Sequence, residues 1–389
     1  MKTANIDFLI VGAGIAGLWL LAELKAKGYS VLLCEANAIG AGQTIASQGI
    51  IHGGTKYALT GKLSKATTAI SDMPKRWKQA LTGQGRVNLQ DVNWLSSHQL
   101  LWTSPNIASK VTGFFASKVM QSRMQLVDAA NYPELFQHAD FNGKLYQLDE
   151  PVLDIPSLLK SFQQQFSDCI IKTDAKHSRL KQHGKQWAFE TVSNHKPLQI
   201  NAQQIILTAG EGNEALCEPL GLAAPQMQRR PLRMLIAKAK HLPKIYAHAL
   251  GVSDKPKMTI TTHQDKNGDS VWYIGGEPAE KGARQTEQDC IAETQQALQK
   301  SLAWFDCSAL RWSSFYINRA EGIQKHGKRP DQPFIQQIDN VTVTWPTKLA
   351  FAPMLADELL KRFAEVQVLD TAEIPEGMEL ASLANAVWG

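Results

Sequence analysis

The first 35 residues contain the pattern that most constrains the fold of this chain. An apolar run, Ile6–Val11, is followed by the loop Gly12-Ala13-Gly14-Ile15-Ala16-Gly17, by a segment with helical periodicity, and by a second apolar run that ends in Glu35. Gly12 permits a tight turn out of a strand, Gly14 lets the backbone approach a diphosphate, and Gly17 lets the helix pack closely on the sheet. We interpret the whole as a βαβ unit that binds a dinucleotide.

The helix start and the acid supply the other recognition groups of such a unit. The amides of a helix N-terminus, with the positive end of its dipole, bind phosphate, so we expect Ile15 and Ala16 to contact the diphosphate. Glu35 follows Gly17 by 18 residues, a spacing that suits a carboxylate accepting hydrogen bonds from a ribose, with Ala36 beside it.

The uncharged stretch Phe8–Ala22 also raises the alternative of a signal peptide. Asp7 and Glu23 bracket it closely, no small-residue cleavage pattern follows, and its fifteen residues fall short of a membrane span, which needs about 20. We therefore expect neither a signal peptide nor a transmembrane segment, whereas peripheral contact with a membrane stays compatible with the sequence.

Composition narrows the class of protein further. At 389 residues and 44% apolar content, the chain can form one large or two interleaved domains. The five cysteines are scattered without metal-ligand spacing, which favours a reducing, cytoplasmic location and argues against a metal site. The net charge of +5 is dispersed, which fits a solvated basic face or recruitment of an anionic substrate. No basic stripe with interleaved aromatic residues indicates nucleic-acid binding.

The order of the remaining patterns predicts an α/β (α+β) fold in which two domains interleave. Alternating or β-branched runs at Arg233–Ala237, Lys257–Thr262 and Val271–Gly275, with a hairpin signal at Asn267-Gly268, predict a mainly antiparallel sheet. Val92–Thr103 also has the pattern of a strand. We assign residues 1–85, 137–215 and 315–389 to a Rossmann-like nucleotide domain, and residues 86–136 and 216–314 to a substrate domain.

A second glycine pattern, Gly210-Glu-Gly212-Asn-Glu-Ala215, follows the apolar strand Gln204–Thr208. A second dinucleotide, such as NADPH, is one interpretation. The segment after it is short and interrupted by Pro219, and no acid ends a second strand. The pattern therefore favours a tight turn where this strand returns beneath the first cofactor.

Four landmarks in order resemble the FAD-dependent oxidoreductases of the D-amino-acid oxidase and glycerol-3-phosphate dehydrogenase superfamily. They are the N-terminal unit with Glu35, residues 40–54 (GAGQTIASQGIIHGG), Leu207-Thr-Ala-Gly210, and Lys348-Leu-Ala-Phe-Ala-Pro353. The resemblance implies FAD, in an FAD-binding domain interleaved with the substrate domain. Attachment is expected to be non-covalent, because no cysteine lies near the last landmark and His52 lacks the spacing of histidine-linked members.

The glycines of residues 40–54 let the backbone pass close to a planar ring, while Thr44, Ser47 and Gln48 offer hydrogen bonds. The predicted cofactor contacts are Gly12, Gly14, Ile15, Ala16, Gly17, Glu35, Ala36, Gly42, Gln43, Thr44, Ser47, Gln48, Gly49, Ile51, Ala209, Gly210, Lys348 and Leu349.

On the substrate side, the resemblance singles out three residues of the His52-Gly-Gly-Thr-Lys-Tyr segment. His52 is either a proton acceptor or substrate contact near the ring, or a histidine satisfied by packing. Lys56 matches a position where flavin-linked glycerol-3-phosphate dehydrogenases typically have an arginine in contact with the substrate anion. Tyr57 is a further candidate for contact with the substrate. The alternative for both Lys56 and Tyr57 is an ordinary exposed residue without a role in the site.

Two more cations complete the predicted catalytic set. Lys348 lies where the superfamily places a positive group that stabilises charge on the reduced ring. The resemblance also implies an arginine in this region that faces the substrate anion, which a guanidinium binds in two-point fashion. Arg319 and Arg329 are the two candidates, and we favour Arg319. An ion pair with Glu321 is the structural alternative for either arginine.

The sequence thus predicts an FAD-dependent oxidoreductase that removes a hydride from a C–H next to a hydroxyl or amine of a small, polar, anionic substrate. A hydroxy acid or polyol phosphate is favoured, and an amino acid or N-methyl amine is the nearest alternative. A nicotinamide-dependent dehydrogenase and a non-catalytic flavin-binding subunit are the other classes considered. The electron acceptor, whether oxygen, a quinone or a carrier protein, is unknown.

Overall fold

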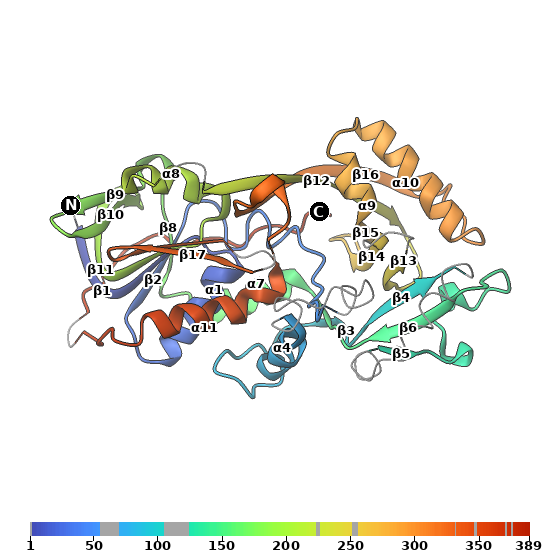
Figure 1. The fold of residues 1–389 in the computed structure, drawn as a ribbon, viewed down its shortest axis with the longest axis horizontal. Helices are drawn as coiled ribbons and strands as arrows, with labels where there is room; N and C mark the ends of the chain where they lie inside the picture. Colours follow the sequence, from blue (N-terminus) through green and yellow to red (C-terminus); the bar gives the residue numbers. More distant parts are fainter. Residues whose placement is uncertain are drawn as a thin grey trace.

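The computed structural model describes residues 2–54, 70–104, 124–222, 226–250, 256–330, 332–345, 348–369, 372–374 and 376–389. Two eight-stranded sheets lie beside each other along the long axis of the molecule, and a short two-stranded sheet lies between them on one side (Figure 1). The amino terminus is at the far end of the first sheet. The mixed α/β architecture confirms the predicted fold class.

The first sheet is built around parallel strands in the order β17-β18-β11-β1-β2-β8, and β10 and β9 continue from β11 as antiparallel strands. β17 is also antiparallel to its neighbour. The strands are β1 (Lys2–Val11), β2 (Val31–Glu35), β8 (Ile170–Lys172), β9 (Arg179–His183), β10 (Gln186–Ser193), β11 (Lys196–Leu207), β17 (Phe334–Ile338) and β18 (Val341–Trp345).

The register of this sheet places three distant sequence segments at one edge. Val11 is paired with Leu207 on one side and with Cys34 on the other, so β1, β11 and β2 end together. Gly12, Glu35 and the residues after Leu207 consequently emerge side by side, where parallel sheets bind their ligands.

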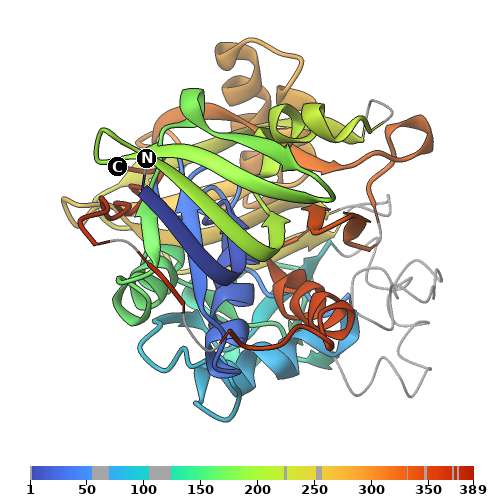
Figure 2. The same cartoon turned by 90° about the vertical axis from the view of Figure 1, so that its left-hand side faces the viewer.

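In the described part of the chain, five helices contribute to the hydrophobic core on the first sheet. They are α1 (Ile15–Ala26), α4 (Met73–Leu81), α7 (Ile155–Gln165), α8 (Asn213–Cys217) and α11 (Ala352–Arg362). α1 connects β1 to β2, and α11 packs beside it, as Figure 2 shows from the end that carries the amino terminus. The start of α7 is stabilised by Pro156 in its first turn and by the Asp154 carboxylate, which accepts from the Ser157 amide.

The second sheet has the order β16-β12-β15-β14-β13-β4-β6-β5 and is antiparallel except between β4 and β13. α9 (Glu277–Gly282) and α10 (Glu287–Ser301) pack against it, and buried Leu298 joins the core of its covered face. The strands are β4 (Gln99–Thr103), β5 (Met124–Leu126), β6 (Lys144–Leu148), β12 (Met227–Ala239), β13 (Tyr246–Leu250), β14 (Pro256–Gln264), β15 (Ser270–Gly275) and β16 (Arg311–Gly322).

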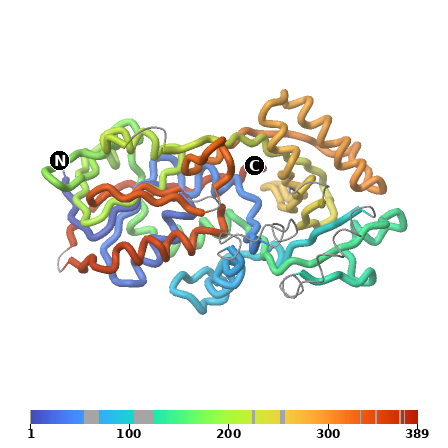
Figure 3. Tube along the Cα trace, viewed as in Figure 1, coloured from blue at the N-terminus to red at the C-terminus, as the bar shows by residue number. Residues whose placement is uncertain are grey.

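The carboxy-terminal segment connects the two sheets. It forms isolated bridges from Leu383 to Ile39 and from Leu380 to Ile171, then brings Trp388 against the second sheet. Trp388 stacks on His263 with ring centroids 4.0 Å apart. The trace in Figure 3 accordingly shows the chain ending near the middle of the molecule.

Two local expectations differ from the structure. Val92–Thr103 is not one strand, because a turn separates β3 (Trp94–Ser96), which pairs with β7 (Val152–Leu153), from β4. β6 and the whole of β16 belong to the second sheet, although the sequence-based limits place 137–215 and 315–389 in the nucleotide domain. The division into domains stays a prediction. Among the described residues, no helix combines the length and apolar character needed to cross a membrane.

Candidate active site

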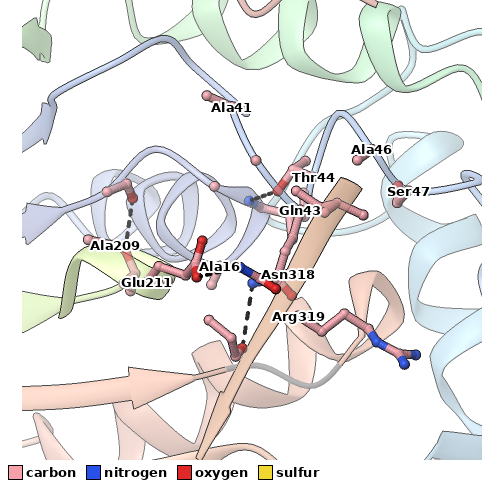
Figure 4. A pocket seen from close by; sticks show the side chains of 18 of the residues that line it. Ala16, Ala41, Gln43, Thr44, Ala46, Ser47, Ala209, Glu211, Asn318 and Arg319 are labelled. Atoms are coloured by element: carbon pink, nitrogen blue, oxygen red, sulfur yellow. Dashed lines mark hydrogen bonds between the residues drawn. The ribbon is translucent and has the colours of Figure 1, made fainter. Parts of the chain in front are cut away.

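A cavity of about 590 Å³ lies where the carboxyl ends of β1, β2 and β11 meet the second sheet. This volume is typical of sites that bind small molecules and cofactors. Figure 4 shows side chains from residues 41–47 and from the start of α1 on one part of its wall, and Asn318 and Arg319 from β16 on another.

The three fingerprint glycines have different surroundings. Gly12 has φ +108°, and a Cβ there would lie 2.5 Å from the Ala209 Cα. A Cβ at Gly17 would lie 2.2 Å from the Gly12 carbonyl oxygen, so Gly17 serves close packing and does not line the cavity. At Gly14 only the Thr44 hydroxyl is near, at 3.4 Å. Gly14 therefore borders open space, as a residue beside a diphosphate should.

The start of α1 has the features of an anion site. Gly14 is its N-cap and offers no side-chain cap, and the first turn carries no acid. The Thr44 hydroxyl oxygen accepts from the Ile15 amide at 3.0 Å, which leaves its own hydrogen for a ligand.

Glu35 is held rigidly at the end of β2. One carboxylate oxygen accepts from the Ala13 amide and the other from the Asn37 amide, each at 2.7 Å. Burial raises the pKa of the carboxyl, while these two hydrogen bonds and Lys172 oppose the rise. The Glu35 side chain thus fixes the fingerprint loop as well as lining the cavity.

Ser47 and Gln48 continue the wall towards the second sheet. In the part of the chain that the structure describes, the buried Ser47 hydroxyl has no hydrogen-bond partner, which is the environment of a group that can bind a ligand. The Gln48 amide nitrogen instead donates to the carbonyls of Thr259, at 3.2 Å, and Tyr273, at 2.9 Å. The donor group that the sequence assigned to the cofactor therefore binds the second sheet.

The cavity wall also contains cationic side chains. Arg319, Arg329 and Lys348 all line it. The Arg319 side chain is only 19% exposed and reaches Glu280 at 3.5 Å. Its buried Nε has no hydrogen-bond partner among the described residues. Burial, together with the positive charges of Arg230 and Arg329, lowers the pKa of Arg319 to about 10, although Glu280 and Glu321 oppose the change. Glu321 does not pair with Arg319, because Arg230 binds it at 2.6 and 2.9 Å.

His52 lines the cavity, and its ring contacts the carboxylate of Glu150. Its Nδ1 is 3.2 Å from a carboxylate oxygen of Glu150, which is buried and accepts from the Gly53 amide with its other oxygen at 2.8 Å. The ring of His248 lies parallel to that of His52, with centroids 5.6 Å apart. Neither Glu150 nor His248 was singled out by the sequence.

The structure brings together most of the predicted site. Every predicted cofactor contact lines the cavity except Gly17 and Ile51, which is fully buried, and so do His52, Arg319 and Lys348. Lys56 and Tyr57 lie outside the described residues. Sequence reasoning missed the β15 end, where Gly275-Gly276 lets the second sheet approach Gln48, since a Cβ at Gly275 would lie 2.6 Å from the Gln48 side-chain oxygen. A glycine pair at a strand end was the available signal.

Comparison with known proteins identifies the class. The sequence model of the DAO family, described as FAD dependent oxidoreductase, matches residues 7–344. The chain belongs to this family of FAD-dependent oxidoreductases. It is 41% identical over 392 residues to the probable FAD-dependent oxidoreductase PA4991 of Pseudomonas aeruginosa, covering 100% of this chain and 98% of the relative.

Solved structures agree on the fold. The crystal structure of PA4991 superimposes with a TM-score of 0.85 at 36% identity, covering 100% of this chain and 98% of that one. Glycine oxidase from Geobacillus kaustophilus superimposes with a TM-score of 0.66 at 12% identity, covering 95% of this chain and 99% of that one. L-alpha-glycerophosphate oxidase from Mycoplasma pneumoniae superimposes with a TM-score of 0.63 at 14% identity, covering 99% of this chain and 100% of that one. These two distant structures share the fold alone.

FAD is the cofactor of this oxidoreductase, and the residues present fit it. The diphosphate would be held at Gly14 and the start of α1, the ribose at Glu35, and the unsatisfied Ser47 hydroxyl would gain a partner. When bound, FAD supplies the group that accepts a hydride. The protein supplies orientation, exclusion of water and the charges described above.

Proposed function

We propose that this oxidoreductase oxidises a small anionic substrate at a carbon that carries a hydroxyl, with hydroxy acids and polyol phosphates as the favoured classes. The anion would be held at Arg319 and Arg329, with the reacting carbon facing the flavin site. Lys348 would contribute positive charge beside the cofactor. Lys56 and Tyr57 remain candidates for substrate contact.

The observation that carries this proposal is the incompletely neutralised Arg319 in the cavity wall. A buried guanidinium without full hydrogen bonding is costly, whereas a carboxylate or phosphate would satisfy its fork in two-point fashion. Burial is the main cause of the lowered Arg319 pKa, and the neighbouring guanidinium groups of Arg230 and Arg329 contribute to it. An anion beside Arg319 would reduce both costs. A neutral substrate would leave this charge unmatched.

His52 supports the preference for a hydroxyl over an amine. Oxidation of an alcohol releases the hydroxyl proton together with the hydride, so a proton acceptor beside the substrate is needed. An amine can react in its neutral form, which already offers a lone pair. The imidazole of His52, which lines the cavity, can receive the hydroxyl proton.

Anaerobic reduction of the FAD-loaded protein tests the substrate class. The panel contains 2-hydroxy acids, glycerol phosphates, the matching amino and N-methyl amino acids, and neutral isosteres such as hydroxy amides and glycerol. Loss of the oxidised flavin absorbance is followed by stopped flow. We expect anionic alcohols to reduce the flavin, and neutral isosteres to require roughly 10-fold or higher concentrations. Reduction by amines alone would favour the amino-acid oxidase alternative, and equal reduction by neutral isosteres would overturn the anion site.

A further inference from the structure

We propose that Glu150 is a positioning residue that fixes the protonation pattern of His52, so that its Nε2 serves as the proton acceptor in the cavity. Glu150 does not line the cavity and would touch neither substrate nor FAD. Its effect passes through the hydrogen bond to His52. The catalytic consequence rests on the proposed function, whereas the protonation pattern can be measured by itself.

The hydrogen-bond directions around Glu150 lead to this assignment. The Gly53 amide can only donate, and it donates to one carboxylate oxygen at 2.8 Å. The other carboxylate oxygen faces the His52 Nδ1 at 3.2 Å, and an ionised carboxylate can only accept. Nδ1 must therefore carry the hydrogen. In the neutral ring, Nε2 is then the unprotonated nitrogen, the one able to receive a proton.

The surroundings also hold the two side chains in place. Glu150 is 2% exposed and His248 is 1% exposed, so neither can move into solvent without disrupting the packing. The His248 Nδ1 is bonded to the Thr259 hydroxyl at 2.7 Å, which orients its ring parallel to His52. Carboxylates that bind the second nitrogen of a functional histidine set its tautomer and ring orientation in many sites.

Replacing Glu150 by glutamine should reverse the tautomer of His52 with little change in the size of the side chain at position 150. The glutamine oxygen would accept from the Gly53 amide, because the opposite orientation would oppose two donors. Its NH₂ group would then donate to the His52 Nδ1 and drive the ring hydrogen to Nε2. Glu150→Gln should consequently convert the acceptor nitrogen in the cavity into a donor.

The first experiment reads the tautomer directly. The FAD-loaded protein is labelled with ¹⁵N-histidine, and His52→Gln assigns the His52 signals in a long-range ¹H–¹⁵N spectrum. We expect the neutral wild-type ring to be protonated at Nδ1 and the Glu150→Gln ring at Nε2. Asp149→Asn is the matched control, because Asp149 is 69% exposed and pairs with Lys78. An unchanged tautomer in Glu150→Gln would overturn the inference.

The second experiment measures the consequence. With the substrate found in the reduction panel, Glu150→Gln should lower the limiting rate of flavin reduction by roughly 10²-fold, with the substrate dissociation constant nearly unchanged. Glu150→Asp should recover part of the rate, and adding Glu150→Gln to His52→Gln should cause no further loss. Additive losses would contradict action through His52. If His52→Gln alone kept the full rate of flavin reduction, His52 would not be the proton acceptor, which would contradict the proposed function. The spectrum would still decide the tautomer.

The same cluster has a metal alternative that the experiments must address. His52, Glu150 and His248 can each offer a ligand atom, all within 4.8 Å of one another. Elemental analysis of the dialysed FAD-loaded protein should find no stoichiometric transition metal. A bound metal that disappears in Glu150→Gln would overturn the positioning role, because Nδ1 or Nε2 of His52 would then be a ligand.

Discussion

Arg230 and Arg319 are directly opposite each other in the antiparallel pairing of β12 with β16. Like charges in this arrangement repel. Arg230 forms two hydrogen bonds to Glu321, whereas the acidic partner of Arg319 among the described residues is Glu280, at 3.5 Å. The ladder therefore holds a partly compensated positive charge at the wall of the cavity, where an anionic substrate can neutralise it.

Arg319→Leu should weaken binding of an anionic substrate more than it alters stability. Loss of a charge-assisted hydrogen bond of about 1.5–3 kcal/mol corresponds to a rise in KM of roughly 10- to 150-fold. The free energy of unfolding should stay level or rise, because the repulsion with Arg230 disappears. Steady-state kinetics measures KM, and urea unfolding measures the free energy of unfolding. Arg229→Gln, at an exposed arginine paired with Glu214, is the control and should leave KM unchanged.

Alanine at Gly14 and at Gly12 should separate cofactor binding from folding. At Gly14, with φ −73°, the added Cβ meets only the Thr44 hydroxyl, so the protein should fold but retain FAD at least roughly 10-fold more weakly, because the methyl group enters the phosphate space. At Gly12 the φ of +108° and the contact with Ala209 backbone should lower stability by at least about 1–2 kcal/mol. Flavin content per protein and thermal unfolding distinguish the two. Equal flavin content in Gly14→Ala and wild type would argue against a diphosphate at this turn.

His263 should make the protein less stable in acid. Burial lowers its pKa from 6.5 to about 3, so between these values the unfolded chain binds a proton that the folded chain does not. Stability is therefore full above pH 6.5 and falls as the pH drops towards 3, by about 2 kcal/mol at about pH 5. Urea unfolding at neutral and acid pH measures it. In His263→Phe this part of the pH dependence should vanish, and an unchanged slope would show that other groups cause it.

Trp388→Ala should loosen the connection between the carboxy terminus and the second sheet. The Trp388 indole nitrogen donates to the Gln264 carbonyl at 3.1 Å, and its ring covers His263 and Tyr273. Removing the buried ring should lower the free energy of unfolding by about 3–5 kcal/mol. Exposure of His263 should also reduce the acid sensitivity described above, which connects the two measurements. A loss in stability with the full acid sensitivity retained would mean that His263 stays buried without Trp388.

Local patterns were sufficient for the nucleotide-binding unit. Gly12, Gly14, Gly17 and Glu35 lie within one βαβ segment, so the steric demands of the turn and the length of the helix fix their relative positions before any distant contact forms. The hairpin at Asn267-Gly268 was predictable for the same reason, and Gly268 has the positive φ that this turn requires.

The sequence by itself therefore determined the cofactor class and most of the residues that line the cavity beside the fingerprint loop. Only the tertiary structure decided the partners of the substrate-side residues. Arg230 binds Glu321, so the charge of Arg319 is only partly compensated. Gln48 binds the second sheet, and Glu150 hydrogen-bonds His52. These pairs lie on different strands and loops, 91, 225 and 98 residues apart. Such contacts depend on sheet register and on how the two sheets pack against each other, which no local pattern encodes.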